Sequence, residues 1–237
     1  INNTVNVLRI IFDWALEDNL IIRNPINKNI RPLDVEKNRE AFTMKEVEYL
    51  FENKWDNEEC YFYSLTAAIT GLRFSEVAGL KPENIYEDYI DVKTQFLEKE
   101  CDVKHHEARF VTIPKILAQK LKQVCENRKF IFNSPVLSDA PISRKTVIKH
   151  FYKHYSAQMQ NDKTTRVLTF HSLRYFFNTF LVSQNIQSQK IDFLIGHSSG
   201  RGSMQQLYTS WKPEMYGDVL QLQTELLTKI VPAASSW

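Results

Sequence analysis

The sequence lacks any uninterrupted run of about 18 uncharged apolar residues, although 43% of its 237 residues are hydrophobic. A helix that spans a membrane needs a run of about that length, so we expect no membrane partner. The first five residues also lack an initiator methionine and the basic-then-apolar pattern of a secretory signal. We therefore interpret the sequence as a fragment of a longer protein.

Cysteine is scarce as well. The three cysteines, Cys60, Cys101 and Cys125, are odd in number and have no metal-ligand spacing. Such usage favours free thiols in a reducing compartment over a disulfide framework. The sequence thus predicts a cytoplasmic protein.

Metal-ligating and nucleotide-binding motifs are missing too. His150 and His154 are spaced for one face of a helix, but no glutamate of a zinc-protease motif accompanies them. We interpret these two histidines as DNA-facing or partly buried. Because no Walker A loop occurs either, we expect no metal and no other cofactor.

The small formal net charge of +2 conceals a strong local asymmetry. Between Ser143 and Arg174 seven basic residues stand against one acid, whereas residues 46–59 carry six acids and one lysine. This distribution is typical of a protein with one nucleic-acid-binding face, although charge alone fits a solvated helical surface equally well. The basic residues that we assign to a DNA-binding face are Arg144, Lys145, Lys149, Lys153 and Arg166.

The hydrophobic pattern predicts a mostly α-helical chain with a small antiparallel β-sheet, an α+β fold. The expected helices cover residues 2–20, 43–53, 58–69, 73–80, 117–127, 143–159, 171–183, 189–195 and 216–231, with one more after the loop 198–203. Two β-rich alternating runs, Tyr89–Phe96 and Arg109–Ile113, are expected to form the sheet. The polar residues 97–108 would then form a long hairpin between them.

Proline and polar residues divide the chain into parts. The first helix has to stop before Asn24-Pro25, because a residue that precedes proline avoids the helical region. We interpret residues 1–24 as the last helix of a truncated domain and residues 25–39 as a linker. Residues 40–237 then form the main domain.

Residues that carry chemistry are concentrated between Phe170 and Trp211. They are His171, Arg174, His197 and Tyr208. Arg73, about a hundred residues upstream, starts a helix after a glycine, where unpaired backbone N–H groups suit an anion. Arginine forks match phosphate oxygens, histidine moves protons near neutral pH, and tyrosine can hold a phosphate covalently. The set therefore predicts attack on a phosphodiester.

Glu76 stands three residues after Arg73 and gives that arginine a second interpretation, a local ion pair. The two interpretations are compatible. A carboxylate behind the guanidinium would hold it in place for an anion.

Four segments resemble the catalytic domain of the tyrosine recombinases, the phage integrase family. They are Thr-Gly-Leu-Arg-Phe-Ser-Glu-Val at 70–77, His-Ser-Leu-Arg at 171–174, Leu-Ile-Gly-His-Ser at 194–198 and Leu-Tyr at 207–208. The resemblance covers about residues 40–216, and the first helix looks like the end of that family's core-binding domain. It implies the tyrosine recombinase catalytic-domain fold and a site-specific recombinase. Such an enzyme cleaves and rejoins DNA through a 3′-phosphotyrosyl intermediate, without metal or ATP.

The resemblance also implies a role for each matching residue. Tyr208 would be the nucleophile that attacks the scissile phosphate. Arg73 and Arg174 would clamp its non-bridging oxygens and stabilise the transition state. His171 would assist proton transfer from the tyrosine, and His197 would donate a hydrogen bond to the phosphate.

Two supporting residues follow from the same resemblance. Glu76 looks like the acidic residue that supports the first arginine and histidine. Lys104 looks like the hairpin lysine that protonates the leaving 5′ hydroxyl, since it lies five residues before Arg109. The family's usual threonine after that lysine is replaced by His105, so Lys99 remains an alternative.

The spacing of the tyrosine departs from the family pattern. Tyr208 lies eleven residues after His197, where about nine are usual, and the loop 199–203 accounts for the difference. The rival nucleophile, Tyr216, lies beyond Pro213 and nineteen residues after His197. We therefore prefer Tyr208.

The expected partners also come from the resemblance. They are double-stranded DNA with recombination sites and further copies of this chain, as a tetramer on the DNA. In this family a C-terminal segment often docks into a neighbouring protomer, a role that falls here to residues 216–231. Packing of that helix on its own domain is the alternative. A prokaryotic or phage-encoded mobile element is the implied source.

Two other functions fit part of the pattern. A type IB topoisomerase-like enzyme would use the same chemistry to relax supercoils as a monomer, but the first and last helices favour recombination. A non-catalytic DNA-binding accessory protein on the same fold would not need all five of the arginine, histidine and tyrosine residues.

Overall fold

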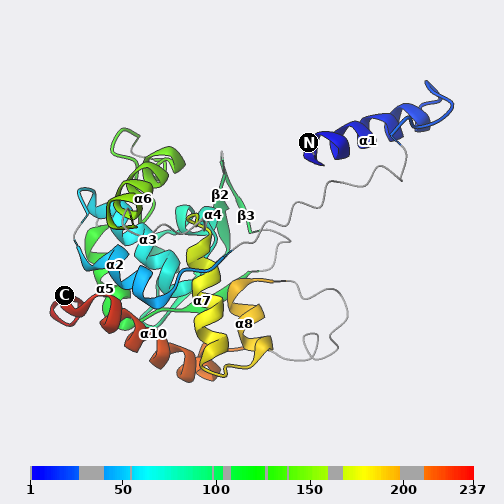
Figure 1. The fold of residues 1–237 in the computed structure, drawn as a ribbon. Coiled ribbons are helices and arrows are strands. Elements are labelled where there is room, and N and C mark those ends of the chain that lie inside the picture. The colour runs from blue at the N-terminus through cyan, green and yellow to red at the C-terminus, as the bar shows by residue number, and fades with distance from the viewer. Residues whose placement is uncertain are drawn as a thin grey trace. The chain divides into compact units, whose positions relative to one another are not determined.

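The computed structural model describes residues 2–26, 40–53, 55–97, 99–103, 108–125, 128–137, 139–159, 168–197 and 211–237. The chain divides into two units, Ile1–Asn38 and Arg39–Trp237 (Figure 1). All three cysteines are in the reduced, thiol form. Among the described residues, no helix is both long enough and apolar enough to cross a membrane.

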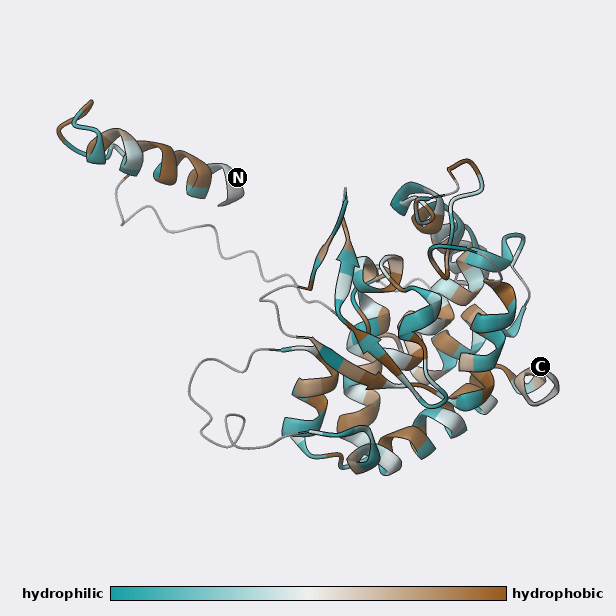
Figure 2. Cartoon of the chain, turned by 180° about the vertical axis from the view of Figure 1, so that it is seen from behind, coloured by the Kyte–Doolittle hydropathy of each residue, from teal (hydrophilic) through white to brown (hydrophobic). Residues whose placement is uncertain are grey.

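The first unit contains helix α1, Asn2–Glu17, which ends three residues before its predicted boundary. The chain leaves the helix at Asn19, whose φ of 57° is left-handed. The Asn24 side chain then donates a hydrogen bond of 2.6 Å to Asp13 Oδ1. Hydrophobic residues occur along α1 (Figure 2), and Trp14 on this helix is 62% exposed. The helix is thus amphipathic and carries an apolar side that the first unit does not cover.

The second unit is mostly helical and contains two small pairs of strands, which confirms the predicted fold class. Its α-helices are α2 (Met44–Glu52), α3 (Glu58–Thr70), α4 (Phe74–Ala78), α5 (Lys115–Val124), α6 (Arg144–Met159), α7 (Ser172–Ser183), α8 (Ser188–Ile195) and α10 (Gly217–Ile230). Its 3₁₀ helices are η1 (Pro82–Asn84), η3 (Pro213–Tyr216) and η4 (Pro232–Ser236). Its strands are β1 (Tyr89–Val92), β2 (Thr94–Phe96), β3 (Glu100–Asp102) and β4 (Arg109–Thr112).

The strands differ from the prediction in one respect. Strands β1 and β4 pair antiparallel as expected, with Val92 opposite Arg109. The run that was predicted to continue to Phe96 is broken at Lys93, and β2 pairs instead with β3, inside the segment predicted to be a polar connection. Buried residues explain the break: Gln95 follows Val92 by three residues, so the strand face that turns inward changes.

Helix α3 lies at the centre of the core and packs against α4, α6, α7 and α10 (Figure 1). Every residue of α3 from Cys60 to Thr70 is buried, as is typical of a helix covered on all sides. The buried hydroxyls of its serine and threonines are satisfied within the helix, for example by the 2.7 Å hydrogen bond from Thr66 Oγ1 to Phe62 O. The helix therefore forms a rigid support for the residues that follow it.

Helix α3 ends at Gly71 because of both conformation and space. Gly71 has a φ of 67°, in the left-handed region that favours glycine. A Cβ at this position would lie 2.4 Å from Cδ1 of Phe177 on α7. The close approach of α7 to this turn brings Arg174, one helical turn before Phe177, to the start of α4 and hence to Arg73.

Helix α10 packs on α2 and α3 of its own domain. Its buried Gln223 donates through Nε2 to Ile69 O at 2.9 Å and to Thr112 O at 2.8 Å. Ile69 O is among the last four carbonyls of α3, which lack partners within the helix. The single chain thus satisfies the end of α3 with a side chain from its own C-terminal helix.

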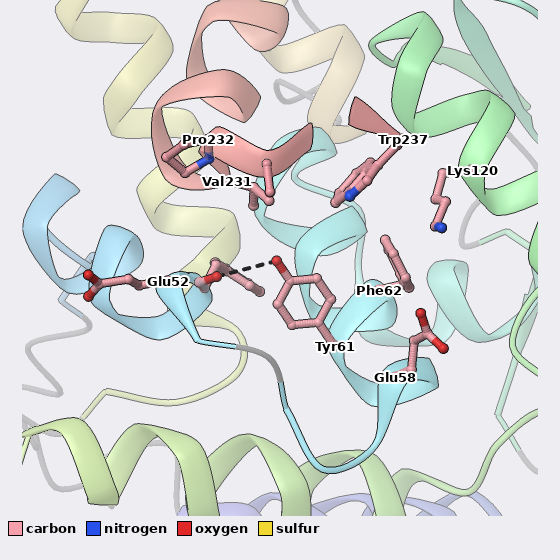
Figure 3. A pocket seen from close by; sticks show the side chains of 10 residues that line it. Glu52, Glu58, Tyr61, Phe62, Lys120, Val231, Pro232 and Trp237 are labelled. Atoms are coloured by element: carbon pink, nitrogen blue, oxygen red, sulfur yellow. Dashed lines mark hydrogen bonds between the residues drawn. The ribbon is translucent and has the colours of Figure 1, made fainter. Parts of the chain in front are cut away.

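A pocket of about 300 Å³ lies beside the C-terminal segment (Figure 3). Among its lining residues are Tyr61 and Phe62 of α3, Lys120 of α5, and Val231, Pro232, Ala233 and Trp237. The Trp237 ring meets Phe62 edge-on at 5.3 Å between centroids. Neither Arg73 nor Arg174 lines this pocket, so we place the candidate active site elsewhere.

Candidate active site

Three arginines meet at the C-terminal end of α8. The helix ends at Gly196, whose φ of 60° lets the chain turn back so that the amides of Gly196 and His197 bond to earlier carbonyls of the helix. The next three carbonyls accept from side chains. Leu194 O accepts from Arg109 Nε at 2.8 Å, Ile195 O from Arg174 Nη2, and Gly196 O from Arg73 Nη2 at 2.6 Å.

The chemistry of a helix end explains this arrangement. The last carbonyls of a helix have no partner within it and carry the negative end of the helix dipole, which attracts cations. Three consecutive carbonyls point in different directions, so they hold three guanidinium groups from three different elements. The end of α8 therefore sets the spacing of the arginines.

Glu76 binds two of these arginines and is 1% exposed. Its Oε1 accepts from Arg73 Nη1 at 2.8 Å and from Arg109 Nη1 at 3.0 Å. Its Oε2 accepts from the Arg73 backbone N at 2.8 Å and from Arg109 Nη2 at 2.9 Å. Burial alone would raise the pKa of this carboxyl, but the charges and hydrogen bonds of Arg109 and Arg73 outweigh burial and lower the pKa to about 2. Glu76 is therefore a charged carboxylate at neutral pH.

Arg174 is held from two sides and is buried. Besides its bond to α8, its Nη1 donates to Gly71 O at 2.7 Å. Burial, reinforced by the nearby charge of Arg73, lowers the pKa of this guanidinium to about 9. The group remains charged at neutral pH, in surroundings where an added anion would stabilise it.

The two histidines flank these arginines. His197 follows Gly196 directly and is exposed. The covered part of this side chain loses hydration, and this loss first, and then the charge of Arg174, lower its pKa below the ordinary value of 6.5, so the neutral form predominates at pH 7. His171 precedes α7, its backbone carbonyl accepts from Arg174 N at 3.1 Å, and its ring meets Tyr175 edge-on. A neutral imidazole of either residue can donate one hydrogen bond.

Comparisons with known proteins agree with this geometry. Residues 40–214 match the sequence profile of the Phage integrase family. The chain belongs to the phage integrase family.

The chain is 23% identical over 215 residues to the integrase of Mycobacterium phage L5. That alignment covers 84% of this chain and 56% of the phage L5 protein, so the chain spans just over half the length of this relative. Among solved structures, it is similar to the Tn1549 transposon integrase in complex with a circular intermediate DNA. The TM-score is 0.67 and the identity 20%, over 83% of this chain and 71% of that one.

A lambda integrase dimer bound to a COC′ core site is also similar, with a TM-score of 0.64 and 20% identity over 84% of this chain and 71% of that one. The integrase of Mycobacterium phage Brujita matches 97% of this chain and 76% of its own, with a TM-score of 0.61 and 17% identity. These structures show that the second unit has the catalytic-domain fold of the tyrosine recombinases.

Lys104, Tyr208 and Arg166 lie outside the described residues. Lys99, the alternative to Lys104, is exposed in the turn between β2 and β3.

Tyr216, the rival nucleophile, is fully buried in η3. Its ring packs against Phe110 at 5.1 Å, Phe193 at 6.0 Å and Trp211 at 5.6 Å between centroids. Burial raises the pKa of its hydroxyl above the ordinary range. A nucleophile in this position would have to leave the core before it could reach DNA, which weighs against Tyr216.

The predicted DNA-binding face on α6 begins close to the three arginines. The guanidinium of Arg144 lies 4.8 Å from the centroid of Phe74, the residue that follows Arg73. Lys145 and Lys149, one helical turn apart, are exposed. Arg144 thus lies at the start of α4, next to the residue that follows Arg73.

Lys153 belongs to a different cluster, formed around Asp56. Its Nζ lies 2.6 Å from Asp56 Oδ2, while His150 Nδ1 and His154 Nε2 lie 2.9 and 3.0 Å from Oδ1. The His154 ring also stacks on Trp55. Both histidines are therefore partly buried, one of the two interpretations that the sequence left open, and Asp56 offsets the charge of Lys153.

Arg109 is the residue that the sequence analysis missed as part of the site. The signal was present but faint: alternation places Arg109 on the same strand face as Val111 and Ile113, and both of these are fully buried. An arginine on an apolar strand face needs a buried partner, and that partner is Glu76.

We predict that Glu76→Gln destabilises the fold in a pH-dependent way. The folded pKa of about 2 lies below the ordinary 4.5, so Glu76 stabilises the fold fully above about pH 5. This contribution is lost as the pH falls from 4.5 toward 2. At pH 7 the variant leaves buried guanidinium charge uncompensated, at a cost of about 3–5 kcal/mol. The free energy of unfolding is measured in urea at pH 7, 4 and 3 for both proteins. The difference between wild type and variant should become smaller as the pH falls.

The matched control for Glu76→Gln is Glu87→Gln, which removes an exposed carboxylate paired with Lys115 at 2.7 Å. Exposed ion pairs contribute little to stability. At pH 7 Glu87→Gln should therefore lower the free energy of unfolding much less than Glu76→Gln does. Equal effects of the two substitutions would contradict the assignment of a buried charge network to Glu76.

We predict that Gly196→Ala destabilises the fold by at least about 1–2 kcal/mol, since alanine is disfavoured at this φ. In addition, the new Cβ would lie 2.8 Å from Cζ of Arg109. Gly217→Ala is the control, because nothing lies within 4 Å of its Cβ position and its φ is −56°. That substitution should be neutral or slightly stabilising. Urea midpoints that fall equally in both variants would rule out a special requirement at Gly196.

Proposed function

We propose that this chain is the catalytic part of a site-specific DNA recombinase, an integrase that cleaves and rejoins DNA strands through a 3′-phosphotyrosyl intermediate. The observation that carries the proposal is the fixed pair of arginines, Arg73 and Arg174, bound to neighbouring carbonyls of α8 beside the exposed His197. Membership of the phage integrase family supports it.

The proposed reaction begins with the phosphate. Arg73, whose side chain is 27% exposed, and Arg174 bind the non-bridging oxygens of the scissile phosphate. His197 donates a hydrogen bond to the same group. As the phosphorus becomes five-coordinate, the negative charge on these oxygens grows, and donors that are already in position stabilise it without reorganising. The arginines thus supply the charge stabilisation, so the proposal requires neither a metal nor ATP.

Bond making and breaking follow. The hydroxyl oxygen of Tyr208 bonds to phosphorus, and His171 assists the removal of its proton. The bond from phosphorus to the 5′ oxygen breaks, and Lys104, or Lys99 as the alternative, protonates the leaving hydroxyl. One phosphoester bond replaces another, so the phosphotyrosyl bond conserves the energy needed to rejoin a strand when a 5′ hydroxyl attacks it.

Assembly on DNA forms part of the proposal. One similar structure is described as a lambda integrase dimer bound to a core site, and we infer a homo-oligomer on DNA, a tetramer, in the cytoplasm of a prokaryotic host. In the single chain α10 packs on its own domain. If α10 docked into a neighbouring copy, Gln223 would lose its hydrogen bonds to Ile69 O and Thr112 O of its own chain. It would then donate to the same two carbonyls of the neighbour.

Covalent trapping tests the proposed reaction. The protein is incubated in EDTA with nicked suicide duplexes taken from the DNA that flanks its gene, and adducts are located by peptide mass spectrometry. We expect an adduct on Tyr208 that Tyr208→Phe abolishes and Tyr216→Phe retains, because Tyr216 is buried.

Other outcomes of the trapping experiment separate the alternatives. An adduct on Tyr216 would preserve the reaction class and overturn the assignment of the nucleophile. Specific binding without any adduct would favour a DNA-binding accessory protein. Relaxation of supercoils by a monomer, without strand exchange, would favour the topoisomerase-like alternative.

We further predict that Lys149→Gln weakens DNA binding about equally for all sequences. It should reduce the slope of log K against log salt by about 1, as the loss of one phosphate contact does. Lys153→Gln is the matched control, since its ammonium lies 2.6 Å from Asp56, and its effect on the slope should be clearly smaller. Fluorescence anisotropy titrations from 50 to 200 mM salt measure both slopes. Equal slopes for the two variants would exclude a DNA-binding role specific to this part of α6.

A further inference from the structure

Arg109 has no role in the reaction proposed above, yet it is the most extensively bonded of the three arginines. Its side chain is 5% exposed. All three of its nitrogens donate: Nε to Leu194 O, Nη1 to Glu76 Oε1 and Nη2 to Glu76 Oε2. Arg109 thus differs from Arg174 in its partners: Glu76 offsets its charge through two hydrogen bonds, whereas Arg174 donates to the neutral carbonyls of Gly71 and Ile195.

Arg109 is connected to Arg73 through one carboxylate, that of Glu76, which binds both arginines. Oε1 of Glu76 accepts from the Nη1 atoms of both arginines, at 3.0 Å from Arg109 and 2.8 Å from Arg73. A fork bound to both oxygens fixes the plane of the carboxylate. If Arg109 were lost, Glu76 would remain buried with Arg73 as its remaining arginine, and the carboxylate would pull that guanidinium away from the phosphate.

A second route runs through the end of α8. The guanidinium of Arg109 lies against Gly196, so closely that a Cβ there would be 2.8 Å from Cζ and 2.9 Å from Nη1. Gly196 O is the acceptor of Arg73 Nη2. The next residue of β4, Phe110, packs on Phe193 of α8 with 5.0 Å between centroids. Arg109 therefore positions the peptide group that holds Arg73 on its other side.

We propose that Arg109 is a positioning residue for phosphodiester cleavage, which sets the orientation of Arg73 from both sides, through the Glu76 carboxylate and through the carbonyl end of α8. The inference rests on the proposed function, because Arg73 must be a phosphate-binding group for its orientation to matter. Arg109 acts on the transition state through Arg73 and does not touch DNA. It also begins β4, five residues after Lys104 in the sequence, and so joins the strand that follows this lysine to the arginine pair.

The test is single-turnover cleavage of a suicide duplex by Arg109→Lys. Lysine keeps the charge opposite Glu76, but it has neither the fork nor the planar group that lies against Gly196. We expect the DNA dissociation constant to stay within about threefold of wild type and the cleavage rate to fall by about 10²-fold, as expected for a small misplacement. Arg109→Gln, which keeps one uncharged donor nitrogen in place of three charged ones, is the second variant and should be slower still.

Arg128→Lys provides the matched control, because Arg128 also pairs with a carboxylate, Glu59, at 2.7 Å. Its cleavage rate should stay within about twofold of wild type. Unfolding midpoints of all variants are measured in parallel, and rates are compared at a temperature at which each protein is folded.

A double-mutant cycle with Arg73→Lys distinguishes positioning from general damage to the fold. If Arg109 acts through Arg73, adding Arg109→Lys to Arg73→Lys should slow cleavage by less than about threefold. If instead the double variant is slowed by the product of the two single factors, the proposal is overturned. A cleavage rate of Arg109→Lys within threefold of wild type, or a loss of DNA affinity parallel to the loss of rate, would also overturn it. A wild-type protein that forms no Tyr208 adduct in the same assay would instead contradict the proposed function.

Discussion

The buried carboxylate of Glu76 is the interaction on which the rest of the site depends. Within the described part of the chain it is the carboxylate bound to two of the three arginines that meet at α8. Guanidinium charge therefore exceeds carboxylate charge in a largely buried region, which is unfavourable in the free protein. Burial first, and then the charge of Arg73, lower the pKa of Arg174. The same excess favours an anion whose charge increases during the reaction. The site is stable enough to form because Glu76 and the helix carbonyls offset part of the cost, and the charge that they leave uncompensated would stabilise the phosphate in the proposed reaction.

Two glycines allow this charge cluster to assemble from distant parts of the sequence. Gly71 ends α3 and Gly196 ends α8, and both have positive φ. At each, the missing side chain leaves room for a group from another element, Phe177 at Gly71 and the Arg109 guanidinium at Gly196. The helix ends are therefore contact points as well as turns. An alanine at either position would change a backbone angle and also separate elements that carry the site.

Local patterns predicted much of this structure. The helix expected over residues 43–53 is present as α2, Met44–Glu52, and the pairing of Arg73 with Glu76, three residues apart, was visible in the sequence. The partners of Arg109 were not predictable, because Glu76 and Leu194 lie 33 and 85 residues away. Asp56 likewise meets His150 and His154 from 94 and 98 residues away. Ion pairs between distant elements leave no periodic signal in the sequence, whereas caps, turns and amphipathic faces do.

The fixed end of α8 also constrains the proposed nucleophile. In the sequence Tyr208 stands between His197 and Trp211, and both of these positions are set by α8. His197 follows the carbonyls that hold the arginines, and the Trp211 ring lies 6.2 Å from Phe193 of α8 and 5.6 Å from Tyr216. Lys190 of α8 in turn bonds to Met215 O at 2.8 Å and to Asp218 of α10. The two described residues that border the segment containing Tyr208, the proposed nucleophile, are thus both attached to α8, and the side of Trp211 is also attached to α10. A displacement of α10 would act first on this attachment, so assembly through α10 and the position of the tyrosine would be physically coupled.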